Sequence, residues 1–154
     1  MGRLTVQEIL DADLTDWSRL AVALHARFAT GDFAAGTRFV TAVSEAAEAA
    51  NHHPDVTLTY PAVDIRVHSH DAGGVTERDV ALARQISDIA HEQGIEAQPA
   101  APTLVEIALD TADPQAVGPF WAAVLTGSPD AYDGDQDVKD PTDQTPLLWL
   151  QRTT

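Results

Sequence analysis

The 154-residue sequence contains no cysteine, only nine basic residues against 24 acidic ones, and no long hydrophobic run. Without cysteine there is no disulfide framework, no thiolate metal ligand and no thiol nucleophile, which fits a reducing compartment. A formal charge of −15 disfavours nucleic acid and anionic membranes as partners, because both attract clusters of lysine and arginine. No segment approaches the roughly 20 apolar residues of a membrane-spanning helix. These absences predict a soluble, cytoplasmic protein.

Histidine, in contrast, is concentrated in residues 51–79, which hold four of the six in the chain. Because an imidazole with a pKa of about 6.5 both gives and takes a proton at neutral pH, such a cluster favours general acid–base chemistry. Each histidine also has a structural interpretation. His52 and His53 follow a predicted helix, where a cation is favourable at the C-terminal end, and His70 could simply be a solvated residue at a strand end.

Hydrophobic periodicity predicts the order helix, strand, strand, helix, strand, strand, helix before residue 94. The helices are predicted at residues 6–10, 33–50 and 77–90, and the strands within residues 17–29, 56–60 and 63–70. The last helix begins with a capping box formed by Thr76 and Asp79. This order predicts an α+β fold, in which an antiparallel four-stranded sheet carries its helices on one face.

The spacing of residues 51–79 identifies a family. His52-His53-Pro54, then Tyr60, then His70, then Thr76-Glu77-Arg78-Asp79 closely resemble the pterin-4a-carbinolamine dehydratases, also called 4a-hydroxytetrahydrobiopterin dehydratases. The resemblance covers about three-fifths of the chain. It implies a hydro-lyase that converts 4a-hydroxytetrahydropterin to quinonoid dihydropterin, after an aromatic amino-acid hydroxylase has used tetrahydropterin. It implies no metal and no organic cofactor.

Carried over by position, the resemblance implies that His52 and His70 are the acid–base pair. Asp79 would set the charge and tautomer of a histidine, and His53 with Pro54 would bind the pterin. His68 matches no functional position, so we expect it to be an exposed or rim residue. Tyr60 is expected to pack within its strand rather than to take part in the chemistry.

Two further implications concern partners. Members of the family assemble as homo-oligomers, and edge strands such as the one within residues 20–28 leave backbone groups available for pairing, so a homodimer or homotetramer is expected. Animal members also serve as dimerisation cofactors of a homeodomain transcription factor. The alternative function is therefore a non-catalytic module that binds pterin or another protein.

Residues 94–102, GIEAQPAAP, are interpreted as a linker between a domain at residues 1–98 and a second unit at residues 103–154. In the second unit a strand at residues 104–109 precedes a helix that Asp113 caps and Gly127 ends, and another strand is predicted at residues 147–150. The six aspartates at positions 130–143 are expected to form a solvated acidic loop.

The second unit resembles part of a glyoxalase-like module of the vicinal oxygen chelate superfamily, with a partial βαββ arrangement. The resemblance is carried by VEIALDTADPQAVGPFWAAVLTG and DPTDQTPLLWLQ. Glu106 occupies the position where metal-binding relatives often have histidine, but a single carboxylate predicts no metal site. A third interpretation makes this unit the functional half of the chain, and its incompleteness argues against that.

Overall fold

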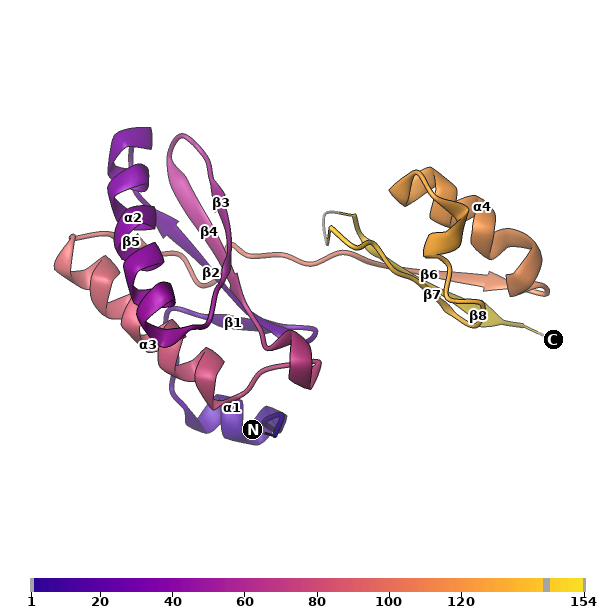
Figure 1. The fold of residues 1–154 in the computed structure, drawn as a ribbon, viewed down its shortest axis with the longest axis horizontal. Helices are drawn as coiled ribbons and strands as arrows, with labels where there is room; N and C mark the ends of the chain where they lie inside the picture. Colours follow the sequence, from indigo (N-terminus) through magenta and orange to yellow (C-terminus); the bar gives the residue numbers. More distant parts are fainter. Residues whose placement is uncertain (1, 143–144, 154) are drawn as a thin grey trace. The chain divides into compact units, whose positions relative to one another are not determined.

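The computed structural model of the chain describes residues 2–142 and 145–153, and it divides into two compact units, Met1–Thr103 and Leu104–Thr154 (Figure 1). The helices of the first unit are α1 (Val6–Asp11), α2 (Phe33–Ala50) and α3 (Glu77–Glu92), with a 3₁₀ turn, η1 (His70–Ala72). Its strands are β1 (Ser18–Leu20), β2 (Ala23–Ala29), β3 (Asp55–Leu58), β4 (Ala62–Val67) and β5 (Glu96–Ala97). The predicted α+β order is confirmed.

The sheet of the first unit is antiparallel, with strand order β1-β2-β4-β3. The short strand β5 adds to it, because Phe28 and Ala29 of β2 pair with Ala97 and Glu96. Interpreting all of residues 94–102 as a linker was therefore wrong. Two of those residues complete the sheet, and the backbone N–H of Gln98 still donates to Arg27.

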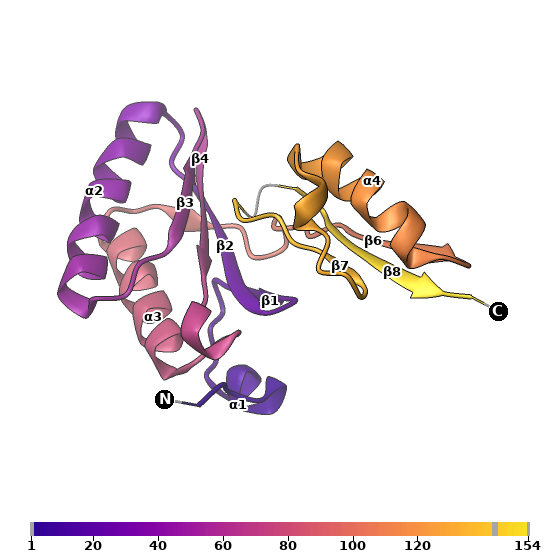
Figure 2. The same ribbon diagram turned by 45° about the vertical axis from the view of Figure 1, so that its right-hand side comes forward.

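The core lies between this sheet and the helices α2 and α3, which cover the same face in Figures 1 and 2. Period-two alternation turns Val63, Ile65 and Val67 of β4 into that core, where all three are buried. Phe28 of β2 is fully buried and makes an edge-to-face contact with Phe39 of α2, at a ring-centroid distance of 5.1 Å. Helix α2 is thus held against the sheet by aromatic packing.

Helix α2 ends so that the chain turns sharply toward the histidines. Asp32 caps its N-terminus by accepting from the backbone N–H of Ala35. Asn51 ends it in the left-handed region, with φ 46° and ψ 43°, a conformation that asparagine tolerates better than most residues. His52 leaves the helix immediately after this turn, and its backbone N–H donates to Ala47.

Tyr60 is not packed in a strand, contrary to expectation. Strand β3 ends at Leu58, and Tyr60 lies in the turn before β4 with 69% of its surface exposed.

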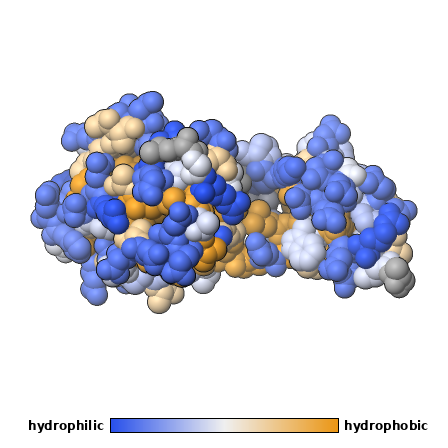
Figure 3. All heavy atoms as spheres, turned by 90° about the horizontal axis from the view of Figure 1, so that it is seen from below, coloured by the Kyte–Doolittle hydropathy of each residue, from blue (hydrophilic) through white to orange (hydrophobic). Residues whose placement is uncertain are grey.

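Figure 3 shows one face of the molecule, which is mostly hydrophilic and carries scattered hydrophobic patches. No helix within residues 2–142 and 145–153 is long and apolar enough to cross a membrane.

The described part of the second unit has the expected βαββ arrangement. It consists of β6 (Glu106–Thr111), α4 (Pro114–Thr126), a 3₁₀ turn η2 (Pro129–Ala131), β7 (Asp137–Val138) and β8 (Leu147–Arg152). The strand order is β6-β8-β7, with β6 parallel and β7 antiparallel to β8. A small core of its own holds this unit together, and it includes Ala122, Tyr132, Val138, Leu148 and Leu150.

The acidic loop is internally bonded as well as solvated. Asp133 Oδ1 accepts from the backbone N–H groups of Asp135, Gln136 and Asp137, and these bonds lower the pKa of the Asp133 carboxyl. Asp140 accepts from the backbone of Thr142 in the same manner. Asp143, the last of the six predicted loop aspartates, lies outside the described residues.

Candidate active site

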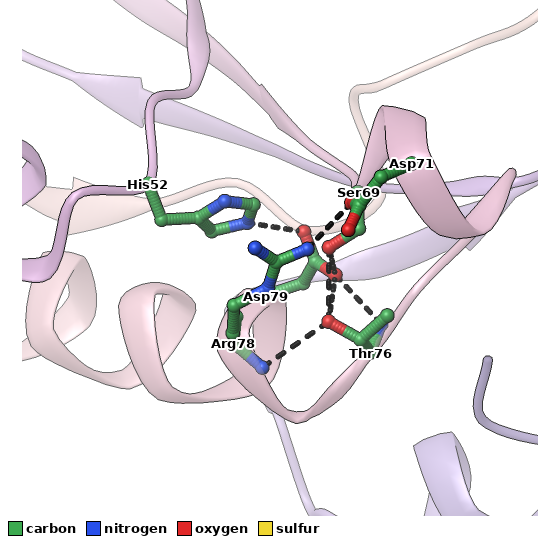
Figure 4. A network of polar contacts seen from close by, with 6 residues as sticks. All are labelled: His52, Ser69, Asp71, Thr76, Arg78 and Asp79. Atoms are coloured by element: carbon green, nitrogen blue, oxygen red, sulfur yellow. Dashed lines mark hydrogen bonds and ion pairs between the residues drawn. The ribbon is translucent and has the colours of Figure 1, made fainter. Parts of the chain in front are cut away.

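The predicted site residues lie where the end of α2, the η1 turn and the start of α3 meet (Figure 4). The sequence places them there by two local devices: the left-handed turn at Asn51, and the capping box of α3. Both are short-range features of the chain. The contact between them is tertiary, and it joins His52 to a residue 27 positions away.

His52 is 8% exposed, and its Nε2 lies 2.6 Å from Asp79 Oδ1. An ionised carboxylate can only accept a hydrogen bond, so Nε2 carries the proton and donates it. In the neutral ring Nδ1 is then the nitrogen with the free lone pair. Figure 4 shows the ring pointing at Asp79 through Nε2. The pair therefore fixes one tautomer of His52, which is what a base or acid with a defined proton position requires.

Asp79 is completely buried, and both of its carboxylate oxygens take part in hydrogen bonds. Its Oδ2 accepts from Ser69 Oγ at 2.8 Å, from the backbone N–H of Thr76 at 2.6 Å and from Thr76 Oγ1 at 2.9 Å. Burial acts to raise the pKa of Asp79, but the hydrogen bonds from His52, Ser69 and Thr76 outweigh it. The pKa of this carboxyl therefore lies below its ordinary value, and at neutral pH Asp79 is a buried anion.

The same carboxylate has a structural task, because Asp79 is the N3 residue of α3. The Thr76 hydroxyl accepts a hydrogen bond from a backbone N–H in the first turn of the helix. The Asp79 carboxylate accepts one from the backbone N–H of Thr76, which completes the capping box. Ser69 is a site neighbour that the sequence did not reveal. Ser69 is 1% exposed, and its hydroxyl also lies 2.9 Å from Thr76 Oγ1. No spacing or composition signal distinguishes this serine from others in the chain.

His53 and Pro54 lie apart from the buried network. The His53 side chain is 54% exposed, and its Nε2 is 3.2 Å from Glu48 Oε1 on the last turn of α2. Pro54 is half-buried. Glu48 is a second neighbour that was not singled out from the sequence, although its position one helical turn before Asn51 could have suggested it. His53 is free to face a ligand, while Glu48 gives it one anionic partner.

His70 lies on the surface, in the η1 turn. Within the described chain no hydrogen bond or ion pair joins it to His52 or Asp79. Its ring instead contacts the ring of His68, at a centroid distance of 4.0 Å and an interplanar angle of 58°. The expectation that His68 is an exposed or rim residue was wrong. Only 8% of its surface is exposed.

An ion pair connects the η1 turn to α3. Arg78 Nη2 donates to Asp71 Oδ1 at 2.5 Å, and this hydrogen bond lowers the pKa of Asp71. The Arg78 Nε is buried and has no hydrogen-bond partner within residues 2–142 and 145–153.

In the described part of the chain, no three histidine or carboxylate side chains are grouped so that they could hold a metal ion. Glu106 belongs to the second unit and is exposed there.

Comparisons with known proteins agree with both resemblances found in the sequence. Residues 3–89 match the family described as pterin 4 alpha carbinolamine dehydratase, and residues 106–154 match a family described as a glyoxalase-like domain. Two relatives with the provisional name pterin-4-alpha-carbinolamine dehydratase come from Thermomicrobium roseum and Chloroflexus aggregans. They are 40% identical over 93 residues and 44% identical over 92 residues. Each match covers 58% of this chain, and 99% and 98% of the respective relative.

A solved structure is also similar. It is the crystal structure of a protein from Brucella melitensis described as a transcriptional coactivator/pterin dehydratase. The match has a TM-score of 0.56 and 32% sequence identity, and it covers 58% of this chain and 99% of the other.

Proposed function

This chain belongs to the pterin 4 alpha carbinolamine dehydratase family, and on that premise we propose that it dehydrates 4a-hydroxytetrahydropterin to quinonoid dihydropterin. The observation that carries the proposal is the buried pair of His52 and Asp79, with Nε2 and Oδ1 2.6 Å apart. It lies within the region that matches the family. It also supplies a histidine whose tautomer is fixed by a buried carboxylate.

The proposed reaction is an elimination across the N5–C4a bond of the pterin. The C4a–O bond breaks with its electron pair going to oxygen, which takes a proton and leaves as water. The N5–H bond breaks with its electron pair forming the N5=C4a double bond, and a base takes that proton. The sum is one dihydropterin and one water, with no change in proton number and no oxidant or reductant. One acid and one base suffice for this chemistry.

His52 can serve in either role because Asp79 supports both of its protonation states. In the neutral ring, Nδ1 holds the lone pair that accepts a proton. Once that proton is bound, the buried Asp79 carboxylate stabilises the imidazolium through the Nε2 hydrogen bond. The hydrogen bonds from Ser69 and Thr76 hold the carboxylate in place. Asp79 is thus a positioning residue, and it need never take up the proton itself.

His70 is proposed as the second member of the acid–base pair, and His53 and Pro54 as pterin-binding residues. Both histidines are exposed, so a ligand can reach their rings, whereas His52 shows only a small part of its surface. The reaction needs no metal and no organic cofactor in this scheme. Its place would be the recycling of tetrahydropterin after an aromatic amino-acid hydroxylase has released the 4a-hydroxy product.

The proposal is tested with the purified full chain and enzymatically generated 4a-hydroxytetrahydropterin. Ultraviolet absorbance should show dehydration that is faster than the spontaneous reaction. His52→Ala and His70→Ala should each lower the rate by roughly 10²-fold or more, as expected for loss of a positioned acid or base. His91→Ala is the matched control, since the His91 side chain is 70% exposed on α3 outside this site. If both site variants stay within twofold of the unmodified chain, the acid–base assignment is wrong.

A non-catalytic role is the alternative, and the similar structure favours keeping it, because that protein is described as a coactivator as well as a dehydratase. In this case the chain would bind a pterin or a protein without turnover. Isothermal titration with a stable dihydropterin, run beside the rate assay, separates the two. Binding with no rate increase supports the module, whereas turnover supports the enzyme.

We also propose that the chain forms a homodimer or homotetramer. Strands β1 and β3 form edges of the sheet, and β3 carries Val56 with 37% of its surface exposed. Edge strands with free backbone groups are favourable sites for pairing between subunits. Light scattering at micromolar concentration should give a multiple of the 16.4 kDa chain mass. A monomer would contradict this proposal without affecting the catalytic one.

A further inference from the structure

His68 is buried next to the exposed His70, for which we proposed a role in proton transfer. The two residues leave β4 in succession, separated by Ser69, and the ring centroids of His68 and His70 lie 4.0 Å apart. His68 is 8% exposed, whereas His70 faces solvent. The His68 ring is therefore held in place by the protein. It contacts the ring of His70, which would rotate freely if only solvent surrounded it.

The backbone beneath His70 is well held, but its side chain is not. Ser69 forms an isolated bridge with Gly74, its hydroxyl donates to Asp79, and Asp71 pairs with Arg78. These contacts fix the η1 turn on both sides of His70. Its own ring makes no hydrogen bond or ion pair in the described chain. The His70 ring does contact the ring of His68, at a centroid distance of 4.0 Å.

The surroundings of His68 add positive charge on one side. Period-two alternation puts Asp64, Arg66 and His68 on the sheet face that is turned away from the helices. His25 of β2 pairs with Arg66 in the register and lies on that same face, and Arg66 also forms an ion pair with Asp55 at 3.0 Å. Burial lowers the pKa of His25, Arg66 and His68 lower it further, and Asp55 acts in the opposite direction. His68 therefore lies close enough to His25 to affect its pKa.

We propose that His68 is a positioning residue for His70, whose ring it holds in the orientation needed for proton transfer. The role rests on the proposed dehydratase function. It requires a flat ring at position 68 and no proton exchange between the two histidines. The family resemblance gives no role to position 68, and the inference comes from the burial of the residue and its ring contact.

The test compares His68→Phe, His68→Leu and His68→Ala with the unmodified full chain. Phenylalanine keeps a flat ring, leucine fills space without one, and alanine does neither. We expect kcat for dehydration to fall about threefold to tenfold in the leucine and alanine variants, with KM nearly unchanged. A fall of this size corresponds to the loss of one ring contact, because the productive orientation of the His70 ring is then less populated. The phenylalanine variant should stay within twofold. His91→Ala is again the matched control.

A second measurement does not depend on activity. Nuclear magnetic resonance relaxation of the labelled His70 ring should show greater ring mobility in the leucine and alanine variants, and unchanged mobility in the phenylalanine variant. If His70 is equally ordered in all of them, or if phenylalanine is as deficient as alanine in kcat, the positioning role is refuted. An unmodified chain without any dehydratase activity would refute the proposed function instead, while the relaxation data would still decide whether His68 orders His70. Should the alanine variant fail to fold, the leucine and phenylalanine pair carries the same comparison.

Discussion

Asp79→Asn is the most informative single substitution, because it removes one charge from a side chain that is fully buried and keeps its shape. The carboxylate accepts from His52 at one oxygen, and from Ser69 and Thr76 at the other. An asparagine has only one accepting oxygen, and its amide nitrogen donates. In either orientation of the amide, its nitrogen faces a group that donated a hydrogen bond to the carboxylate, and that group is left without its acceptor.

The two placements have different consequences. If the amide nitrogen faces His52, the ring must change tautomer, and the free nitrogen Nδ1 becomes a donor instead of a base. If it faces Thr76, the capping box of α3 is broken. One buried donor left without an acceptor costs about 1–3 kcal/mol of unfolding free energy. A fixed wrong tautomer lowers turnover by up to about 10⁴-fold, the loss that the same carboxylate-to-amide change causes in a Ser-His-Asp triad.

Stability should also lose part of its dependence on pH. Because the pKa of Asp79 is lowered in the folded chain, its ionised form adds stability above the ordinary value of 3.8, and this contribution is lost as the pH falls through the folded pKa. Urea unfolding of both proteins at pH 7 and at about pH 3.5 measures the effect. The difference between them should be largest at pH 7 and shrink in acid. Equal stability and equal turnover at pH 7 would refute the reasoning about this carboxylate.

Three further predictions concern the frame of the site and the second unit. Phe28→Ala removes a fully buried ring that contacts Trp17 and Phe39, so denaturant unfolding of the first unit should lose about 3–5 kcal/mol, and a loss below about 1 kcal/mol would contradict this packing. Gly118→Ala places a Cβ 2.7 Å from the ring of Tyr132, so calorimetry of the full chain should show a lower unfolding midpoint for the second unit and an unchanged one for the first. Gly2→Ala is the control, because its added Cβ meets no atom within 4 Å. A chain that ends at residue 98 keeps β5 and should retain dehydration and cooperative unfolding, whereas one that ends at residue 94 leaves part of the β2 edge unpaired and should unfold at lower urea. Inactivity or aggregation of the longer fragment would show that the second unit is an integral part of the fold.

Much of this structure could be predicted because it depends on local signals. Asp32 before an apolar three-four repeat fixed the start of α2, and Thr76 with Asp79 marked the start of α3. The order of helices and strands followed from periodicity. The second unit was predictable for the same reason, since Asp113 and Gly127 enclose a helix of the expected length.

The errors arose where tertiary contacts decide the outcome. We expected His68 to be exposed because it matches no functional position, but it is 8% exposed and its ring contacts the ring of His70, which lies in the following 3₁₀ turn. Strand β5 has only two residues and so has no periodicity to detect. Tyr60 was expected in a strand that ends two residues earlier, at Leu58. Ser69 became a site neighbour only through its contact with Asp79.

The parallel pairing of β6 with β8 has a consequence for synthesis of the chain in the cell. Glu106 pairs with Leu147, so about forty residues must be translated after β6 begins before its partner strand exists. At about 5–20 residues per second, the ribosome needs roughly 2–8 seconds for this segment. Throughout that interval β6 has an unpaired backbone edge, and Ile107 and Leu109 have no Leu148 or Leu150 beside them. Slowing translation after residue 111 would lengthen the time that β6 spends without its partner strand.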